Sequence, residues 1–267
     1  MTEYAIVQER FEQIDPEVLR QVMVDHGGLN RIDATRLARK AQGVLWERFT
    51  MRQAQQVAAE LNHHDYRVRP VPAKDLVKLD KPRTVRRLEF FEDHFDIPWD
   101  LHRSVSIPWL NVFVISAAET RELVEKRRER PSRGTGRPTG EAAYVTETEI
   151  ERSSKRISVT DIVALTAVGG FAHFRLPAHE LHYNRILTDA ASYRPYERYL
   201  MVLQRIVDSS KQAIVSPRTR HILVERQEPR SLAGTEDQVH VEEMNLDRYN
   251  EWLMQLVRFR EDEQSEA

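Results

Sequence analysis

Residues 33–71 have the sequence DATRLARKAQGVLWERFTMRQAQQVAAELNHHDYRVRPV, and this stretch decides the fold of the first part of the chain. Asp33 is a candidate N-cap, because its carboxylate accepts hydrogen bonds from the free N–H groups of a first helical turn. Apolar residues then recur at helical spacing, and Gly43 ends the predicted helix. Residues 44–49 are rich in strand-forming side chains and predict a short strand.

A second helix begins at Thr50 and has one apolar stripe, and residues 66–71 alternate as a half-buried strand. Ahead of this stretch, residues 4–8 predict another strand, and a helix extends from Asp15 and Pro16 to Gly27. Proline suits the first helical position, because the N–H that it lacks has no helical partner there. The predicted order is therefore β-α-α-β-α-β.

This order and its local sequence resemble the C-terminal domain of the bacterial ribosomal stalk protein. The resemblance covers about the first 72 residues of 267 and implies a sheet covered by helices. The same sandwich also resembles a protease adaptor of the Clp system, so the resemblance implies a fold and leaves the function open. The residues that carry it are Asp33, Ala34, Leu37, Leu45, Glu47, Thr50, Ala54, Leu61 and Val68.

In the stalk family a basic, glycine-containing segment between the first two helices contacts translation factors. Arg20 stands for one basic residue of that segment, but Met23 and Asp25 occupy positions where the family has positive charge or glycine. The resemblance therefore does not extend to the factor-binding surface.

The composition indicates a cytoplasmic protein with a well-solvated surface. The net charge is −2, so no overall field favours nucleic acid or an anionic membrane. The chain has no cysteine, which excludes disulfides, thiolate metal sites and a cysteine nucleophile. The amino terminus lacks the pattern of a signal peptide, and the apolar stretch 107–118 is too short to span a bilayer.

Two prolines among alternating charges, Pro72 and Pro82, predict a domain boundary near residue 80. We therefore expect a stalk-like domain over residues 1–78 and an α+β domain over residues 80–267. Strands are predicted in the second domain at 85–91, 111–116, 162–165, 171–176 and 181–187, followed by two amphipathic helices. A mostly antiparallel sheet is the expected core, and a pleckstrin-like half-barrel closed by a helix would satisfy the pattern.

Residues 119–155 interrupt this pattern. The part from Arg121 to Arg137 has seven basic and three acidic residues, with prolines and glycines interspersed. Such a composition buries too little apolar surface to offset its ordering entropy, which predicts a flexible basic insertion. Clustered guanidinium groups also bind phosphates, so Arg127, Arg128, Arg130 and Arg133 are nucleic-acid candidates. The segment lacks interleaved aromatic residues, and a solvated linker is the competing interpretation.

His173, His179 and His182 form the most suggestive chemical cluster, because imidazole is a common zinc and iron ligand. Pro177 separates the first histidine from the others, so they do not share a helical face as the two histidines of a zincin do. Surface and strand positions are the competing interpretation, and no cofactor is expected.

Three functions remain open from the sequence. The preferred one is protein–protein interaction as an adaptor or scaffold, with an unknown protein partner and no catalytic residue. The first alternative is a metal-dependent hydrolase that uses the three histidines. The second is a ribosome- or nucleic-acid-associated protein that acts through residues 121–137.

Overall fold

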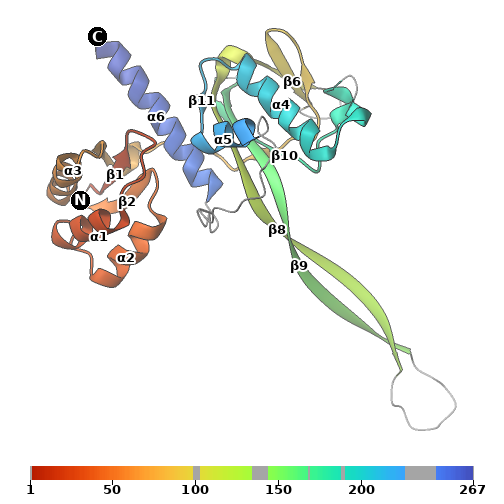
Figure 1. The fold of residues 1–267 in the computed structure, drawn as a ribbon, viewed down its shortest axis with the longest axis horizontal. Coiled ribbons are helices and arrows are strands. Elements are labelled where there is room, and N and C mark those ends of the chain that lie inside the picture. The colour runs from red at the N-terminus through yellow and green to blue at the C-terminus, as the bar shows by residue number, and fades with distance from the viewer. Residues whose placement is uncertain are drawn as a thin grey trace.

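The computed structural model describes residues 2–98, 103–133, 144–167, 169–187, 190–225 and 245–266, and of residues 120–133 and 144–156 it describes the backbone alone. The fold is α+β, as predicted, and contains three separate sheets (Figure 1). None of the helices within these ranges is long and apolar enough to cross a membrane.

The N-terminal unit has the predicted β-α-α-β-α-β order. Its antiparallel sheet has the strand order β2-β1-β3, and three helices cover one face. Ile6 of the central strand faces these helices, whereas its neighbours Ala5 and Val7 face the other way. The elements are β1 (Tyr4–Gln8), α1 (Pro16–Asp25), α2 (Arg31–Lys40), β2 (Val44–Phe49), α3 (Met51–His63) and β3 (Val68–Pro72).

Helix caps set the boundaries of this unit. Thr50 caps α3 as predicted, in a capping box with Gln53. The prediction of Asp33 as the cap of α2 is wrong, because the helix begins one turn earlier at Asn30. The Asn30 Oδ1 atom accepts from the Asp33 backbone N–H at 2.9 Å, and the Asn30 amide donates to the Asp33 carboxylate at 2.6 Å. The Asn30 side chain thus provides a hydrogen-bond partner for the first turn, and α2 begins three residues before the position that the predicted cap at Asp33 implies.

The second region is built on a five-stranded sheet with the order β11-β8-β9-β10-β4 and a small antiparallel sheet with the order β5-β6-β7. The long strands β8 and β9 and their neighbour β10 pair antiparallel, and the short edge strands pair parallel. The strands are β4 (Arg83–Thr84), β5 (Glu89–Phe90), β6 (His94–Pro98), β7 (Ser104–Pro108), β8 (Val112–Arg133), β9 (Tyr144–Leu165), β10 (Phe171–Pro177) and β11 (Ile214–Val215).

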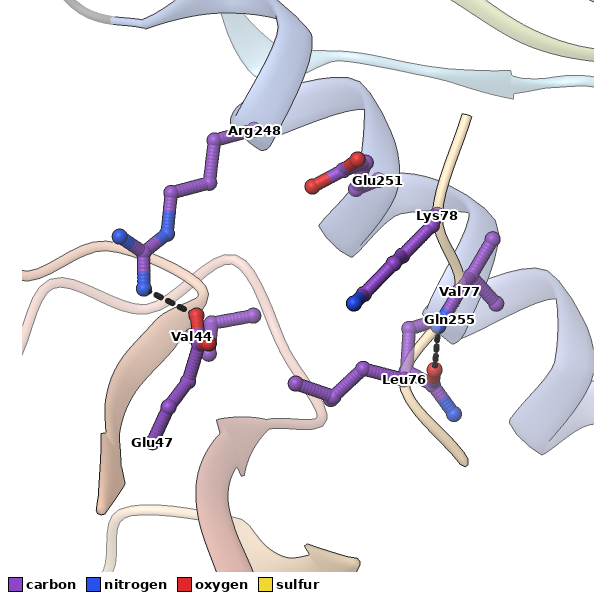
Figure 2. A pocket seen from close by; sticks show the side chains of 8 residues that line it. All are labelled: Val44, Glu47, Leu76, Val77, Lys78, Arg248, Glu251 and Gln255. Carbon is purple, nitrogen blue, oxygen red and sulfur yellow. Dashed lines mark hydrogen bonds and ion pairs between the residues drawn. The ribbon is translucent and has the colours of Figure 1, made fainter. Parts of the chain in front are cut away.

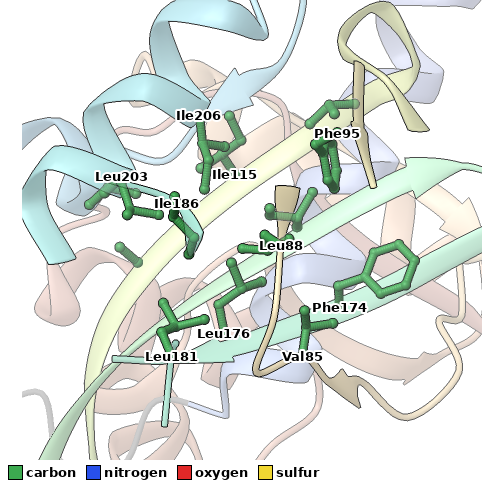
Figure 3. Packing of buried hydrophobic residues seen from close by; sticks show 14 of the residues in the cluster. Val85, Leu88, Phe95, Ile115, Phe174, Leu176, Leu181, Ile186, Leu203 and Ile206 are labelled. Atoms are coloured by element: carbon green, nitrogen blue, oxygen red, sulfur yellow. The ribbon is translucent and has the colours of Figure 1, made fainter. Parts of the chain in front are cut away.

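Helices cover both faces of the five-stranded sheet. On one face, α4 (Pro195–Ser209) and the small sheet enclose a core that includes Ile115, Phe174 and Leu203 (Figure 3). On the other face lies α6 (Leu246–Glu266), and α5 (Pro217–Glu225) contacts β8. The pleckstrin-like half-barrel is therefore wrong: the sheet is open, because strands that are apolar on both faces pack between two layers instead of curling closed.

The predicted strand at 181–187 is also wrong, because this segment forms a turn around a short 3-10 helix, η3 (Tyr183–Arg185). The turn places the side chains of Leu181, Tyr183 and Ile186 in the core. The Tyr183 hydroxyl donates to the Ala178 carbonyl oxygen at 2.6 Å, and this contact folds the segment back.

The predicted insertion at 119–155 has regular backbone pairing wherever it is described. The β8–β9 register continues from the pair Glu119 and Ser158 to the pair Arg133 and Tyr144. We call these fifteen register pairs the outer ribbon; it projects away from the body of the molecule (Figure 1). The sequence predicted no strands in this insertion; they form because a ladder satisfies backbone groups without burying apolar side chains. Its flexibility stays a prediction, and residues 134–143 lie outside the described ranges.

Helix α6 lies between the two sheets. One side packs on Ala5, Val7 and Val71 of the N-terminal sheet, and the other on residues of β8 and β9 that include Val114 and Val159. Helix α6 and the residues that it contacts on both sheets therefore belong to one hydrophobic core. The predicted boundary near residue 80 falls in the linker, but α6 from the second region covers the open face of the first sheet.

Candidate functional site

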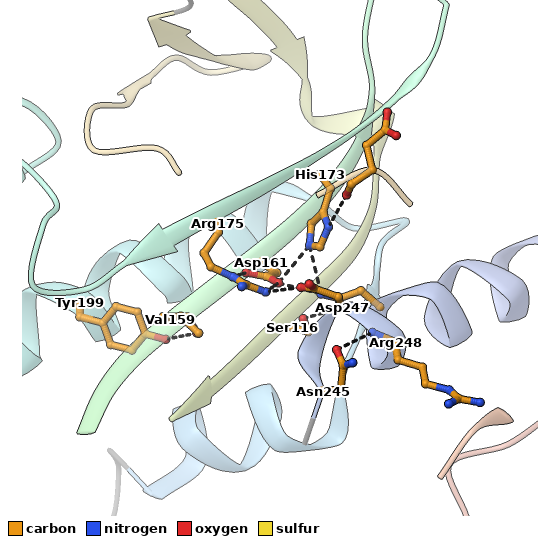
Figure 4. Close-up of polar contacts among 11 residues, drawn as sticks. Ser116, Val159, Asp161, His173, Arg175, Tyr199, Asn245, Asp247 and Arg248 are labelled. Atoms are coloured by element: carbon orange, nitrogen blue, oxygen red, sulfur yellow. Dashed lines mark hydrogen bonds and ion pairs between the residues drawn. The ribbon is translucent and has the colours of Figure 1, made fainter. Parts of the chain in front are cut away.

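A buried polar network lies where α6 meets the five-stranded sheet (Figure 4). At its centre is the Asp161 carboxylate on β9, which is 0% exposed. Ser116 on β8 and Arg175 on β10 are its register partners, so the three side chains form one row across the sheet. His173, two residues before Arg175, lies on the same face. The sheet therefore positions four polar side chains toward α6.

Every oxygen of the Asp161 carboxylate has a donor. Oδ1 accepts from Arg175 Nε at 2.8 Å, and Oδ2 accepts from the Arg175 guanidinium at 2.6 Å. Oδ2 also accepts from the Asn250 side-chain amide of α6 at 2.8 Å, and His173 Nε2 lies 3.0 Å away. A buried carboxylate is costly unless it is paired and hydrogen-bonded, and these contacts meet both conditions.

Arg175 joins two carboxylates. Its terminal nitrogen donates to Asp161 and, at 2.7 Å, to Asp247 in the first turn of α6. Burial alone lowers the pKa of Arg175, but the hydrogen bonds and negative charges of Asp161 and Asp247 raise that pKa above its ordinary value. The guanidinium is therefore charged at every pH at which the protein folds, and it ties α6 to β10.

Two further contacts extend the network. The Ser116 hydroxyl donates to Asn250 Oδ1 at 2.5 Å, so both polar atoms of the Asn250 amide have partners on the sheet. His173 Nδ1 faces the Asp80 backbone carbonyl at 3.3 Å, which connects the linker to the same cluster. Helix α6, the five-stranded sheet and the segment before β4 that contains Asp80 are therefore connected through this buried network.

Asp161, His173 and Asp247 are close enough to share a metal ion, since one ligand atom from each lies within 4.8 Å of the others. Within the described ranges, no group of this kind includes His179 or His182. The Arg175 guanidinium already lies between the two carboxylates and supplies the positive charge there. A cation would have to displace it, so the geometry favours a structural ion-pair network.

The other two histidines lie apart from His173. His179 Nε2 is 3.6 Å from the Glu180 carboxylate, and His182 is exposed at a different surface hollow. The three-histidine site predicted as an alternative is therefore not assembled. Sequence reasoning found His173 and missed Asp161 and Asn250; the signal for Asp161 was a charged residue inside an otherwise apolar strand.

A small cavity of about 40 Å³ lies between α6, β2 and the linker (Figure 2). The Gln255 side chain accepts from the Val77 backbone N–H at 3.0 Å, and Arg248 of α6 pairs with Glu47 of β2. Glu251 accepts from the Leu79 backbone N–H at 3.2 Å. This cavity holds little more than a water molecule, so the region is a joint and not a ligand site.

The arginines predicted to contact nucleic acid lie on the outer ribbon. The register places Arg128 and Arg130 directly opposite Glu149 and Glu147. Arg127 and Arg133 lie opposite Ile150 and Tyr144, which are uncharged. The strand β9 thus places acidic residues opposite Arg128 and Arg130, although residues 144–158 contain three basic as well as three acidic residues and leave the net charge of the ribbon unchanged.

A second hollow, of about 430 Å³, lies beside β4 and is lined by three arginines and His182. It shares no lining residue with the buried network.

Comparison of the chain with protein-family models, curated proteins and solved structures found no match.

Proposed function

We propose that the protein is a non-enzymatic adaptor or scaffold of the cytoplasm that binds a partner protein through the outer ribbon. The observation that carries this proposal is the unpartnered length of the ribbon. Its fifteen register pairs span roughly 50 Å at the usual rise per strand residue. Along the described part of the ribbon, no third strand pairs with either edge.

Unpaired strand edges are a favourable surface for a partner strand, because each offers a row of free N–H and C=O groups. An isolated two-stranded ribbon is only marginally stable in water. A partner that adds a strand or covers one face supplies the missing contacts. A long ribbon without a covering layer is therefore typical of an element that is completed on binding.

Charge favours a protein partner over a nucleic acid. The backbone register pairs Lys126 with Glu151, Arg128 with Glu149 and Arg130 with Glu147. A phosphate-binding surface needs a local excess of positive charge, and at these three register positions each basic residue lies opposite a glutamate. The resemblance of residues 1–72 to a stalk-type or Clp-adaptor fold also supports a binding role.

The test is a variant in which residues 122–155 are replaced by Asn-Gly. Arg121 and Arg156 are register partners, and a two-residue Asn-Gly turn joins paired strands without disturbing them. Partners captured from native cytoplasm by the full chain and by the variant are then compared. We expect the variant to unfold cooperatively, as the full chain does, and to lose the specific partner.

A photo-crosslinking residue placed at Leu123 of the ribbon sharpens this test, and the same residue at exposed Arg52 of α3 is the matched control. We expect crosslinks to the partner from position 123 and none from position 52. If the shortened chain captures the same partner with the same yield, the ribbon is not the binding element and the proposal is wrong.

A further inference from the structure

The hollow beside β4 combines three arginines and a histidine from two chain segments. Arg83, Arg86 and Arg87 come from β4 and the residues after it, and His182 comes from the turn that follows β10. Thr84, Val85 and Pro98 complete the lining. None of these seven residues is aromatic apart from the imidazole, and more of the lining is polar than apolar.

The backbone holds this arrangement in place. The Val85 N–H donates to the Arg175 carbonyl at 2.8 Å, and the His182 N–H donates to the Arg86 carbonyl at 2.9 Å. Val85 and Leu88 are buried in the core beneath, which leaves Arg86 and Arg87 exposed side by side. The side chains therefore start from a fixed frame, which lowers the entropic cost of binding a ligand.

The three arginines of this hollow differ in how far they are already engaged. Arg86 pairs with Glu180, and the Arg83 guanidinium donates to the Pro98 carbonyl oxygen at 3.5 Å. Arg87 has no ion-pair or hydrogen-bond partner among the residues that the structure describes. Among the described residues, Arg87 is therefore the guanidinium of this hollow that is available to a ligand.

We propose that this hollow binds the phosphate group of a small phosphorylated molecule. Guanidinium groups donate paired hydrogen bonds that match phosphate oxygens, and Arg87 supplies an uncommitted pair. The volume of about 430 Å³ lies in the range of small-molecule sites. A nucleic-acid strand is a poorer match, because it needs a line of phosphate contacts and aromatic platforms for its bases.

The test measures binding of inorganic phosphate and of glycerol phosphate to the full chain by titration calorimetry. Arg87→Gln is compared with Arg52→Gln, which removes an exposed arginine of α3 far from the hollow in sequence. We expect both probes to bind the wild-type chain and Arg52→Gln equally well. Loss of one charge-assisted contact should weaken binding to Arg87→Gln at least about tenfold, with unchanged melting.

The two probes separate the sources of the phosphate. Tighter binding of glycerol phosphate supports an organic phosphate whose carbon part lies in the hollow, and equal binding supports recognition of the phosphate group alone. The proposal is overturned if neither probe binds, or if Arg87→Gln binds both as the wild type does. Binding of a single-stranded RNA that phosphate does not displace also overturns it.

Discussion

The inner and outer parts of β8 and β9 belong to the same two strands and share one register, yet their surroundings differ completely. The inner part has further strands on both sides, and its residues Val114, Ile115, Ile162 and Val163 are fully buried. The outer ribbon has no third strand along its described length. One pair of strands is thus both the centre of the core and a projecting arm.

This difference shows that backbone pairing and side-chain burial are separate sources of order. The inner part is held by apolar packing on two faces and by the Asp161 network, whereas the register of the outer ribbon has directly opposed charges.

Removal of the Asp161 carboxylate should destabilise the inner part most. Asp161→Ala leaves the half-buried Arg175 guanidinium and the buried side chains of His173 and Asn250 without their shared acceptor. Breaking a fully buried ion pair costs about 3–5 kcal/mol of unfolding free energy, and we expect the lower end of this range because Arg175 is half-buried and keeps its contact with Asp247. Denaturant unfolding measures it, and Asp262→Ala at an exposed position of α6 is the matched control. A loss below about 1 kcal/mol would show that the network contributes little.

Trp252 should be nearly as sensitive. Its side chain is 1% exposed, its indole N–H donates to the Gln8 carbonyl at 2.8 Å, and its ring contacts those of Phe11 and Tyr249. Truncation of a packed tryptophan costs about 3–5 kcal/mol. Trp252→Ala should therefore lower the melting temperature by several degrees at every protein concentration. A loss of self-association with unchanged melting would instead make this face of α6 an interface.

Gly43 offers a double-mutant cycle for the same contact. Gly43 has φ +77°, and a Cβ atom there would lie 2.3 Å from the Trp252 ring. Gly43→Ala should be strongly destabilising in the wild-type chain, because it adds a clash to the strain of a left-handed alanine. In the Trp252→Ala background only the strain remains, so the cost should be smaller. Equal costs in both backgrounds would contradict the close approach of α6 to the N-terminal unit.

Alkaline pH should weaken the inner part through buried tyrosines. Burial raises the pKa of Tyr249 on α6 to about 12, and a hydrogen bond from Ser216 opposes this only in part. Burial likewise raises the pKa of Tyr183 to about 12. An unfolded tyrosine has a pKa of about 10, so the stability these groups contribute is present below pH 10 and is lost as the pH rises toward 12.

The measurement is the denaturant midpoint of unfolding between pH 9 and 12, a window that follows from these pKa values. Tyr249→Phe should flatten the decline, because it removes one group that must ionise on unfolding. Tyr193→Phe, which removes an exposed phenol, is the matched control. An unchanged decline in Tyr249→Phe would show that this phenol is not sequestered.

The sequence predicted the N-terminal elements well, because each has a local signal. Caps, apolar stripes and strand alternation lie within a few residues of one another, and even the error at Asn30 moved a boundary by a single turn. The outer ribbon was missed for a physical reason. Composition measures how much apolar surface a segment can bury, and a β-ladder forms without burying much. The pairing partner of Lys126 is Glu151, which no local pattern reveals.

The candidate site shows the same limit. His173 was found because histidines are conspicuous, but its partners Asp161 and Asn250 are 89 residues apart in the chain. The position of α6 was predicted in part. Its apolar residues indicated a packed helix. Its second contact, with Ala5 and Val7, could not be predicted because β1 is apolar on both faces, and the sequence does not show what covers the face away from the N-terminal helices.

The smallest expected effect is on the outer ribbon, where charge pairs at directly opposed positions contribute about 0.2–1 kcal/mol each. Lys126→Glu places like charges opposite Glu151, and Glu151→Lys does the same with Lys126. Each single variant should speed amide hydrogen exchange in the ribbon. The double variant restores opposite charges and should return exchange to the wild-type rate.

Global unfolding should be the same in all four proteins, because Lys126 and Glu151 lie far along the ribbon from Ile157, where the ribbon joins the core, and the ribbon is expected to open locally before the core does. Altered amide exchange in the ribbon with unchanged global stability would show that the ribbon opens independently of the inner part of β8 and β9. If either single variant lowers global stability by as much as Trp252→Ala, the ribbon and the body unfold as one unit. If the double variant exchanges as fast as the single variants, Lys126 and Glu151 do not interact across the ribbon, and its register pairs do not stabilise it through charge.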